Sequence, residues 1–287
     1  MSFLKGSVFL ILVVINTLFW VPILLVFALI KLIVPIHAFR RAVSRLLVWI
    51  AETWVALNTH SHRILHGKKL EVSGLNDLQK DDWYLLISNH VAAADIPVLQ
   101  SVFHKKIPFL KFFLKKELIW MPFLGLAWWA LDFPFMRRFT KEYLQKNPHM
   151  KGKDLEITRK ACEKFRDYPI TVINYVEGTR FTQVKHDKQQ SPFTHLLKPK
   201  SGGIGFVLGS MGDRISYLIL TSIKYLPHPP SPWEYMCGKF AKVQVLVEKI
   251  KIPDNLKNKN YLTDSAFKQD LQSWLNELWF KQDKKLS

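Results

Sequence analysis

The sequence has only two cysteines, Cys162 and Cys237, and they are not paired at a short spacing. Disulfide frameworks and cysteine metal sites need several cysteines at defined intervals, so neither is indicated, and a reducing compartment suits this composition. The sequence also lacks a P-loop, a Gly-x-Gly-x-x-Gly fingerprint, an internal repeat and a metal-ligand cluster. The common nucleotide, dinucleotide and metal cofactors therefore have no recognisable motif here.

Acidic residues are scarce as well. There are 23 Asp and Glu against 41 Lys and Arg, which gives a formal net charge of +18. This excess predicts a polyanion or an anionic surface as a partner, and nucleic acid and phospholipid both qualify. A nucleic-acid module should interleave basic residues with exposed aromatics, whereas the basic residues here are scattered. A membrane-tethered nucleic-acid-binding protein is thus the distant hypothesis, and no nucleic acid is expected.

No charge occurs in residues 7–30, a run long enough to cross a bilayer as a helix. No small-residue cleavage site follows it, so a retained anchor is predicted rather than a removed signal peptide. Pro22 leaves two geometries open, a spanning helix or a hairpin lying in one leaflet. If the run spans, the positive charges of Arg40, Arg41 and Arg45 place the body of the protein in the cytoplasm.

Two further apolar segments leave alternatives open. Residues 41–58 form a second helix candidate and residues 115–135 are rich in Trp and Phe, and each suits either membrane contact or a soluble core. We divide the chain into a membrane-anchoring helical segment, residues 1–60, and a folded domain, residues 61–287. No Asp, Glu or Cys accompanies His60, His62 and His66 at ligand spacing, so no metal site is predicted there.

The folded domain alternates predicted strands and helices, which indicates an α/β fold. The predicted strands are residues 83–88, 109–114, 171–176, 215–225 and 239–250. The predicted helices include residues 96–104, residues 154–166 with Cys162 packed inward, and a last helix capped by Asp264. The apolar stripe of that last helix suits a core or a membrane-touching surface.

The strand at residues 83–88 ends directly before Asn89 and His90, and Asp95 precedes Ile96-Pro97, a helix start that its carboxylate is predicted to cap. The turn between them could bring Asp95 back to His90. A carboxylate bonded to one imidazole nitrogen fixes the tautomer and leaves the other nitrogen to take a proton from a hydroxyl. An isolated His-x4-Asp is more often only a helix cap beside a loop histidine, so the surrounding motifs decide.

A second charged motif, Glu177-Gly178-Thr179-Arg180, follows the strand at residues 171–176. Ligands of open α/β sheets bind beyond the carboxyl ends of the strands, so His90 and this motif could share one crevice if their strands are neighbours. Two guanidiniums, Arg137 and Arg138, follow another apolar run. They are either a solvated pair or a phosphate clamp.

In this order, Asn89-His90-x4-Asp95, Phe135-Met136-Arg137-Arg138 and Glu177-Gly178-Thr179-Arg180 resemble the motif series of the PlsC-type glycerolipid acyltransferases. The resemblance extends from about residue 66 to the C terminus. Lys185-His186 and the Leu-Lys-Pro-Lys of residues 197–200 look like the lysophospholipid acyltransferase branch, and closest to YihG-like bacterial acyltransferases.

The resemblance implies a mixed sheet flanked by helices, with residues 61–287 as the acyltransferase domain. It implies that His90 deprotonates the free hydroxyl of a lysolipid and that Asp95 orients His90. The residues implied to bind the acceptor's phosphate are Arg138, Glu177, Gly178, Thr179 and Arg180. The acyl donor is a thioester, acyl-CoA or acyl-ACP, and no further cofactor or metal is expected.

The expected reaction acylates lysophosphatidic acid to phosphatidic acid in phospholipid biosynthesis. Another lysophospholipid, such as lysophosphatidylglycerol or lysocardiolipin, is the near alternative. The resemblance places the protein at the bacterial inner membrane with its catalytic domain on the cytoplasmic side. Its expected partners are these lipid substrates, the bilayer and anionic lipids.

Overall fold

The computed structural model describes residues 1–136, 146–147 and 168–286. Three sequence predictions lie outside the described residues. They concern Arg137, Arg138, and the helix at residues 154–166 that contains Cys162.

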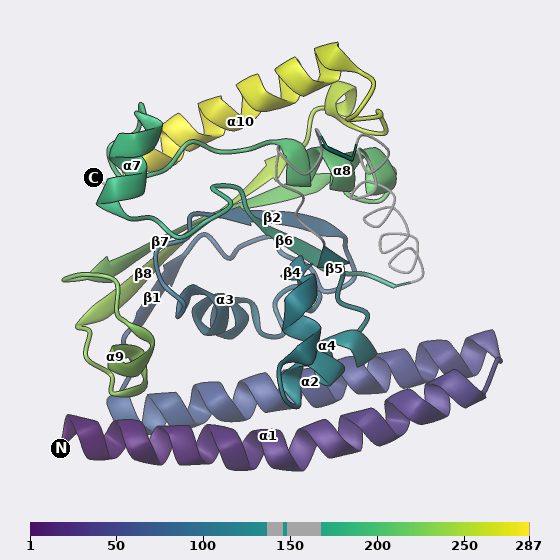
Figure 1. Cartoon of the computed structure of the whole chain (residues 1–287), viewed down its shortest axis with the longest axis vertical. Coiled ribbons are helices and arrows are strands. Elements are labelled where there is room, and N and C mark those ends of the chain that lie inside the picture. The colour runs from purple at the N-terminus through teal and green to yellow at the C-terminus, as the bar shows by residue number, and fades with distance from the viewer. Residues whose placement is uncertain (137–145, 148–167, 287) are drawn as a thin grey trace.

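The chain begins with a hairpin of two long antiparallel helices, α1 (Ser2–Ile33) and α2 (His37–His66), which lie side by side along one edge of the molecule (Figure 1). α1 continues through Pro22. α2 extends well beyond the predicted segment, residues 41–58, because nothing interrupts it before Gly67. There a backbone φ of 78°, which suits glycine, follows the last helical turn.

A mixed six-stranded sheet forms the centre, as expected. The strand order is β1-β8-β7-β2-β6-β3. All neighbours are parallel except β7 and β8, which are antiparallel. The strands are β1 (Leu70–Ser73), β2 (Tyr84–Ser88), β3 (Leu110–Phe112), β6 (Thr171–Tyr175), β7 (Tyr217–Leu226) and β8 (Lys242–Lys251). β2 is buried at every position, as its unbroken apolar sequence requires of a central parallel strand.

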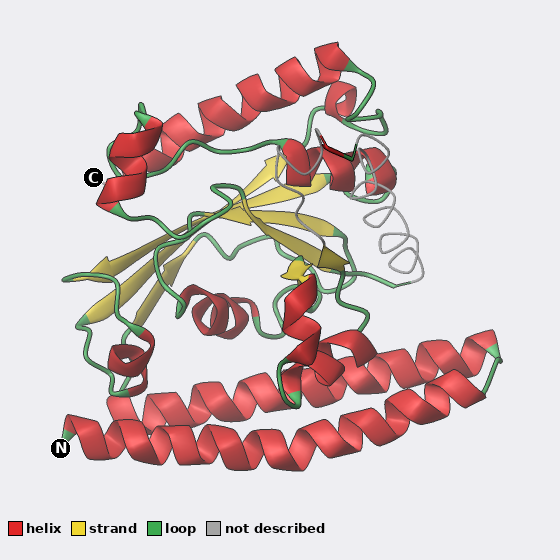
Figure 2. Cartoon of the chain, viewed as in Figure 1, coloured by secondary structure: helices red, strands yellow, loops and turns green. Residues whose placement is uncertain are grey.

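Helices cover both faces of the sheet (Figure 2). Successive side chains of β2 point to opposite faces: Tyr84 and Leu86 join the core on the hairpin side, whereas Leu85 and Ile87 join the core on the other side. The hairpin-side helices are α1, α2, α3 (Asp95–Phe103) and α4 (Leu124–Ala130). The opposite face carries α8 (Gly202–Met211) and α10 (Ser265–Leu286).

Short elements complete the described chain. A separate parallel pair, β4 and β5, lies beside η1 on the hairpin side (Figure 1). Asp264 accepts a 2.8 Å hydrogen bond from the Phe267 amide, so the predicted cap of the last helix is confirmed, and the apolar stripe of that helix is core. The remaining bounds are β4 (Leu114–Lys115), η1 (Lys116–Trp120), β5 (Phe135–Met136), α7 (Gln183–Gln189), α9 (Pro232–Met236) and η3 (Asp254–Leu256).

Among the described residues, α1 is the helix that is long and apolar enough to cross a membrane, a property shared by signal sequences at this position. An apolar N-terminal helix of this kind suggests membrane association. Its outward side exposes large apolar residues, among them Ile11, Ile15 and Phe19. Within residues 115–135 the core alternative applies to Ala127, which is buried, whereas Trp120 is exposed.

Candidate active site

The end of β2 is held in place by Asn89. Its buried side-chain amide donates to the Ile223 carbonyl at 2.9 Å, and its side-chain oxygen accepts from the Ile223 amide at 2.8 Å. A side chain that pairs with the backbone of β7 in this way continues the sheet's hydrogen bonding one residue past the strand. The direction in which the chain leaves β2, and hence the position of His90, is fixed by this contact.

His90 and Asp95 form the pair that the sequence predicts. His90 Nδ1 lies 2.7 Å from Asp95 Oδ2, and the aspartate side chain is fully buried while the imidazole is 17% exposed. A carboxylate can only accept, so Nδ1 carries the hydrogen and Nε2 is left as the basic ring nitrogen. The turn therefore prepares His90 to take a proton from a group that approaches Nε2.

Asp95 does not cap the following helix, and this sequence prediction was wrong. α3 begins at Asp95 without a side-chain cap, and Oδ2 instead accepts from the amides of Val91 (2.7 Å) and Ala92 (3.0 Å) in the preceding turn. Oδ1 accepts a 2.9 Å hydrogen bond from the buried Tyr225 hydroxyl. These donors hold the carboxylate toward His90 rather than toward the helix.

The Glu177–Arg180 motif adjoins His90, because β2 and β6 are paired neighbours. The ring of Tyr175, the last residue of β6, stacks on the His90 imidazole at 4.1 Å between centroids and an interplanar angle of 17°. The Phe181 amide donates to the His90 carbonyl at 2.7 Å. The two strands are neighbours, as the shared-crevice prediction required, and His90 and this motif lie together, whereas Arg138 lies outside the described residues.

Glu177 is fully buried next to the pair. Burial raises the pKa of its carboxyl to about 9; nearby backbone groups of Leu197 and His90 oppose the rise, and the charge of Asp95 adds to it. Within the described residues neither carboxyl oxygen has a partner in hydrogen-bonding geometry. Glu177 is thus a neutral acid at pH 7, and a direct ionic contact with a phosphate is not the role that its surroundings favour.

Basic side chains surround the turn that follows. Gly178 has a φ of 70°, and a β-carbon there would lie 3.6 Å from Lys200 Nζ. Lys185 Nζ donates to Thr179 Oγ1 at 2.8 Å and to the Arg180 carbonyl at 2.9 Å. The exposed Arg180 follows directly. Three cationic residues therefore border this turn, a suitable environment for an anion.

Four residues of this site are not among the sequence-predicted ones: Tyr175, Tyr225, Lys185 and Lys200. The two lysines lie in segments that carried part of the family resemblance, so a signal existed for them. Tyr225 comes from β7, far along the chain, and nothing in its sequence surroundings points to Asp95.

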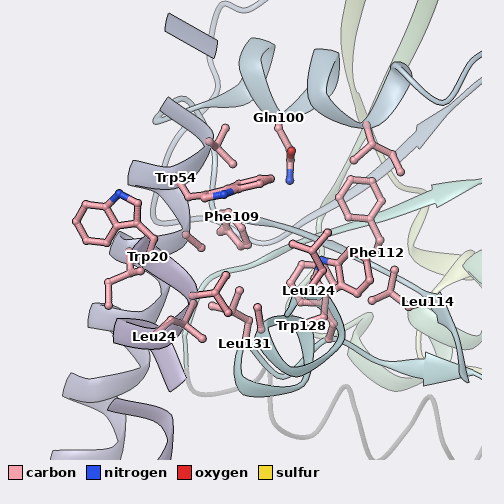
Figure 3. Close-up of a pocket in the computed structure, with 17 residues that line it drawn as sticks. Trp20, Leu24, Trp54, Gln100, Phe109, Phe112, Leu114, Leu124, Trp128 and Leu131 are labelled. Carbon is pink, nitrogen blue, oxygen red and sulfur yellow. The ribbon is translucent and has the colours of Figure 1, made fainter. Parts of the chain in front are cut away.

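An apolar cavity of about 140 Å³ lies on the hairpin side of the sheet, between the hairpin, α3, β3 and α4 (Figure 3). Its labelled lining is aromatic and aliphatic apart from Gln100 of α3. Phe112 of the lining stacks at 6.4 Å with Tyr175, which in turn stacks on His90. One wall of the cavity thus reaches the candidate active site.

In the part of the chain that the structure describes, no three His, Cys, Asp or Glu residues are arranged to hold a metal ion. His62 and His66 belong to an aromatic cluster in which His62 stacks on Tyr235 at 4.6 Å. Burial and the neighbouring His66 lower the pKa of His62 to about 4, which keeps this imidazole neutral.

A family model described as Acyltransferase matches residues 69–213, half of the chain, and includes both His90 and the Glu177–Arg180 motif. The protein therefore belongs to this acyltransferase family. Its similarity to individual curated members is low, and it spans less than half the length of those it matches.

The similar curated proteins carry one activity in their names. Mouse 1-acyl-sn-glycerol-3-phosphate acyltransferase gamma is 22% identical over 184 residues, 60% of this chain and 44% of the relative. The human protein of that name is 32% identical over 78 residues, 26% of this chain and 18% of the relative. Arabidopsis thaliana 1-acyl-sn-glycerol-3-phosphate acyltransferase 3 is 26% identical over 149 residues, 50% and 34% of the two chains.

The fold is similar to that of a solved structure over almost the whole chain. The crystal structure of the 1-acyl-sn-glycerophosphate acyltransferase PlsC from Thermotoga maritima aligns with a TM-score of 0.58 and 16% identity. The alignment covers 99% of this chain and 95% of that one. The helical hairpin is therefore part of the shared architecture.

Proposed function

We propose that the protein is a membrane-bound glycerophospholipid O-acyltransferase that moves an acyl chain from acyl-CoA or acyl-ACP to the free hydroxyl of lysophosphatidic acid, giving phosphatidic acid. The observation that carries the proposal is the 2.7 Å contact between His90 Nδ1 and the buried Asp95 carboxylate, beside a turn bordered by cations. A base and an anion-binding region are what acylation of a phosphate-bearing alcohol needs.

In the proposed reaction the lysolipid hydroxyl approaches His90 Nε2, which takes its proton as the oxygen attacks the thioester carbonyl carbon. Asp95 keeps the hydrogen on Nδ1 and stabilises the imidazolium that forms. The tetrahedral intermediate then collapses, the carbon–sulfur bond breaks, and the thiolate takes the proton back from Nε2. The products are an ester and a free thiol, and no acyl-enzyme is required.

The acceptor's phosphate would lie at the turn formed by residues 177–180. Arg180 can bind phosphate oxygens in a bidentate geometry, and Lys185 and Lys200 add positive charge nearby. Gly178 lets the backbone approach closely, since its φ of 70° suits glycine. In this proposal the neutral, buried Glu177 supports the turn from the protein interior. Arg138 remains a candidate for binding the phosphate.

The donor's acyl chain would enter the apolar cavity of Figure 3. Phe112 of its lining stacks with Tyr175, which stacks on His90, so a thioester carbonyl held at His90 could direct its chain toward this cavity and away from water. Burying methylene groups in this lining is favourable by about 0.8 kcal/mol for each CH₂.

The hairpin would hold the protein on one leaflet, at the bacterial inner membrane with the domain in the cytoplasm. The 32 residues of α1 extend about 48 Å, whereas a hydrocarbon core is about 30 Å thick. α1 also contacts the rest of the protein along its length: Phe3 packs on Trp233, Asn16 donates to the Trp54 carbonyl, and Lys31 forms an ion pair with Asp132. These contacts support the leaflet geometry over a spanning helix.

Acyl transfer from labelled acyl-CoA and acyl-ACP to a panel of lysophosphatidate, lysophosphatidylglycerol and lysocardiolipin tests the proposal. We expect phosphatidate as the main product and a turnover about 10²–10⁴-fold lower for His90→Ala. His195→Ala is the matched control, because His195 is an exposed histidine whose segment is bonded to Asp283 of α10, on the other face of the sheet. A membrane-inserted His90→Ala enzyme with normal turnover, or no acylated product from any acceptor, would refute the proposal.

A further inference from the structure

A second, larger cavity borders α3 next to the cavity of Figure 3. It measures about 400 Å³, within the range of about 300–1,000 Å³ typical of ligand sites. It lies between the hairpin, α3, and the ends of β1 and β8 next to α9. Trp54, Val55 and Gln100 line both cavities and form the partition between them.

The lining of this second cavity combines apolar walls with positive charge. Phe9, Val98 and Phe240 contribute apolar surface. Arg63 and Lys68, both exposed, lie where the cavity meets solvent, near the start of β1. Apolar walls suit a hydrocarbon chain, and cations at the opening attract the anionic head of a lipid as it enters, before its phosphate reaches the turn of residues 177–180.

The second cavity also reaches the candidate base. Phe240 of its lining lies edge-on to Tyr225 at 6.4 Å, and Tyr225 donates its hydroxyl to Asp95. On the other side, Phe112 of the first cavity reaches His90 through Tyr175. The lining of each cavity is thus linked to the His90–Asp95 pair through one tyrosine, and the proposed reaction brings together two hydrocarbon chains.

We propose that the second cavity binds the hydrocarbon chain of the lysophospholipid acceptor and admits this lipid from the membrane past Arg63 and Lys68. The assignment rests on the proposed function, because it takes the acceptor to be an anionic single-chain lipid. The hairpin that would lie on the leaflet forms one wall of the cavity, so the acceptor reaches His90 without crossing water. Donor and acceptor chains then occupy neighbouring cavities that are separated by Trp54, Val55 and Gln100.

Photolabelling tests the site without requiring turnover. Lysophosphatidate with a diazirine at the end of its acyl chain is bound to the membrane-inserted His90→Ala protein, irradiated, and the labelled peptides are identified by mass spectrometry. We expect labels on residues 58–63 or 235–240, which border only the second cavity. Labels confined to residues 124–133 of the first cavity, or found on lipid alone, would overturn the assignment.

Two matched cavity-filling variants provide the kinetic test. Ser101→Phe fills the second cavity, and Ala127→Phe fills the first. Ser101→Phe should raise KM for a long-chain lysophosphatidate by about tenfold, equal to roughly 1.4 kcal/mol of binding, and leave the donor chain-length profile unchanged. Ala127→Phe should instead shift donor preference to shorter chains. A Ser101→Phe enzyme with an altered donor profile and unaltered acceptor KM would contradict the proposal.

The two proposals fail separately. If wild-type protein transfers no acyl chain but residues 58–63 are labelled, the lipid site stands and the proposed reaction is wrong. If acyl transfer occurs and the label lies elsewhere, the reaction stands and the site assignment is wrong. Should Ser101→Phe not fold, photolabelling alone decides.

Discussion

At the scale of single residues, Asp95 offers the sharpest test of the proposed base. Asp95→Asn keeps nearly the same shape but removes the charge. In the wild-type protein His90 and Tyr225 both donate hydrogen bonds to Asp95, so the NH₂ group of an asparagine would face one of these two donors and lose that hydrogen bond. We expect turnover to fall by about 10²–10⁴-fold, as for other histidines that lose their carboxylate partner. Steady-state kinetics of Asp95→Asn, His90→Ala and the double variant measure this.

The two losses should not add, because residues that act as one unit are non-additive. A double variant whose loss equals the product of the single losses would mean that Asp95 and His90 act independently. Far-ultraviolet circular dichroism controls for folding.

Glu177 provides a pH-dependent prediction about stability. Its pKa is raised to about 9 by burial, so between pH 4.5 and 9 folding requires this group to take up a proton. The contribution of protonated Glu177 to the free energy of unfolding is complete below the pKa that this carboxyl has in the unfolded chain. It is lost as the pH rises from that value to the folded-state pKa of about 9. Glu177→Gln removes that dependence, so the variant should gain stability over wild type by about 1.4 kcal/mol per pH unit at most.

Denaturant unfolding of wild type and Glu177→Gln at several pH values between 5 and 9 measures the difference. A constant difference across that range would show that the carboxyl is ionised in the folded protein. Activity of the glutamine variant should persist, since the amide is neutral like the buried acid it replaces.

The residues of the site differ in how visible they are from sequence. His90, Asp95 and residues 177–180 form contiguous motifs at strand ends, and the structure brings them together. The donor set of Asp95 could not be predicted, because whether a carboxylate caps the helix after it or the turn before it depends on turn geometry. Tyr225 reaches Asp95 only through the pairing of β7 with β2.

At the scale of elements, the exposed side of α1 carries a prediction about membrane binding. Ile11→Glu with Ile15→Glu places two charges on a surface that the folded protein leaves bare, with the two isoleucines 56% and 58% exposed. Folding should therefore survive, whereas burial of this face in lipid becomes costly. Membrane flotation should show most of the variant in the soluble fraction.

Val184→Glu is the matched control for that variant, because Val184 is an even more exposed apolar residue, on α7, away from the hairpin (Figure 1). It should stay membrane-bound like wild type. Equal release of both variants, or of neither, would contradict a membrane role for the outer side of α1.

The positions of the strands were easier to predict from local sequence than the residues at which they begin and end. The central strands were predicted within a few residues, because short apolar runs bounded by polar breaks are distinctive. The predicted strand at residues 109–114 divides into β3 and β4, which join different sheets, a distinction that only tertiary pairing makes.

At the scale of the whole molecule, the net charge of +18 predicts salt-dependent binding to anionic membranes. Binding to vesicles that contain phosphatidylglycerol should exceed binding to neutral vesicles at low salt, and the excess should shrink as salt screens the charges. Sedimentation with vesicles at increasing sodium chloride measures this. Binding that is equal for both vesicle types at low salt would show that the apolar surface alone provides the attachment.

The strand order is the part of the molecule that sequence reasoning did not reach. Alternating strands and helices indicated an α/β fold, but the antiparallel pairing of β7 and β8, and the placement of β1 at one edge, depend on long-range contacts. The prediction of a shared crevice was conditional on β2 and β6 being neighbours. The site depends on that adjacency, because it places residues 177–180 beside His90.

The Asp95 carboxylate has a consequence for how its turn forms. Phosphate-binding loops wrap backbone amides around an anion that arrives from solution. Here the chain supplies the anion itself: residues 91 and 92 fold their amides around Asp95, with Tyr225 and His90 completing the shell. The aspartate is therefore an internal ligand of its own loop and is bound before any substrate arrives. The hydrogen bonds that hold its carboxylate also set the position of His90.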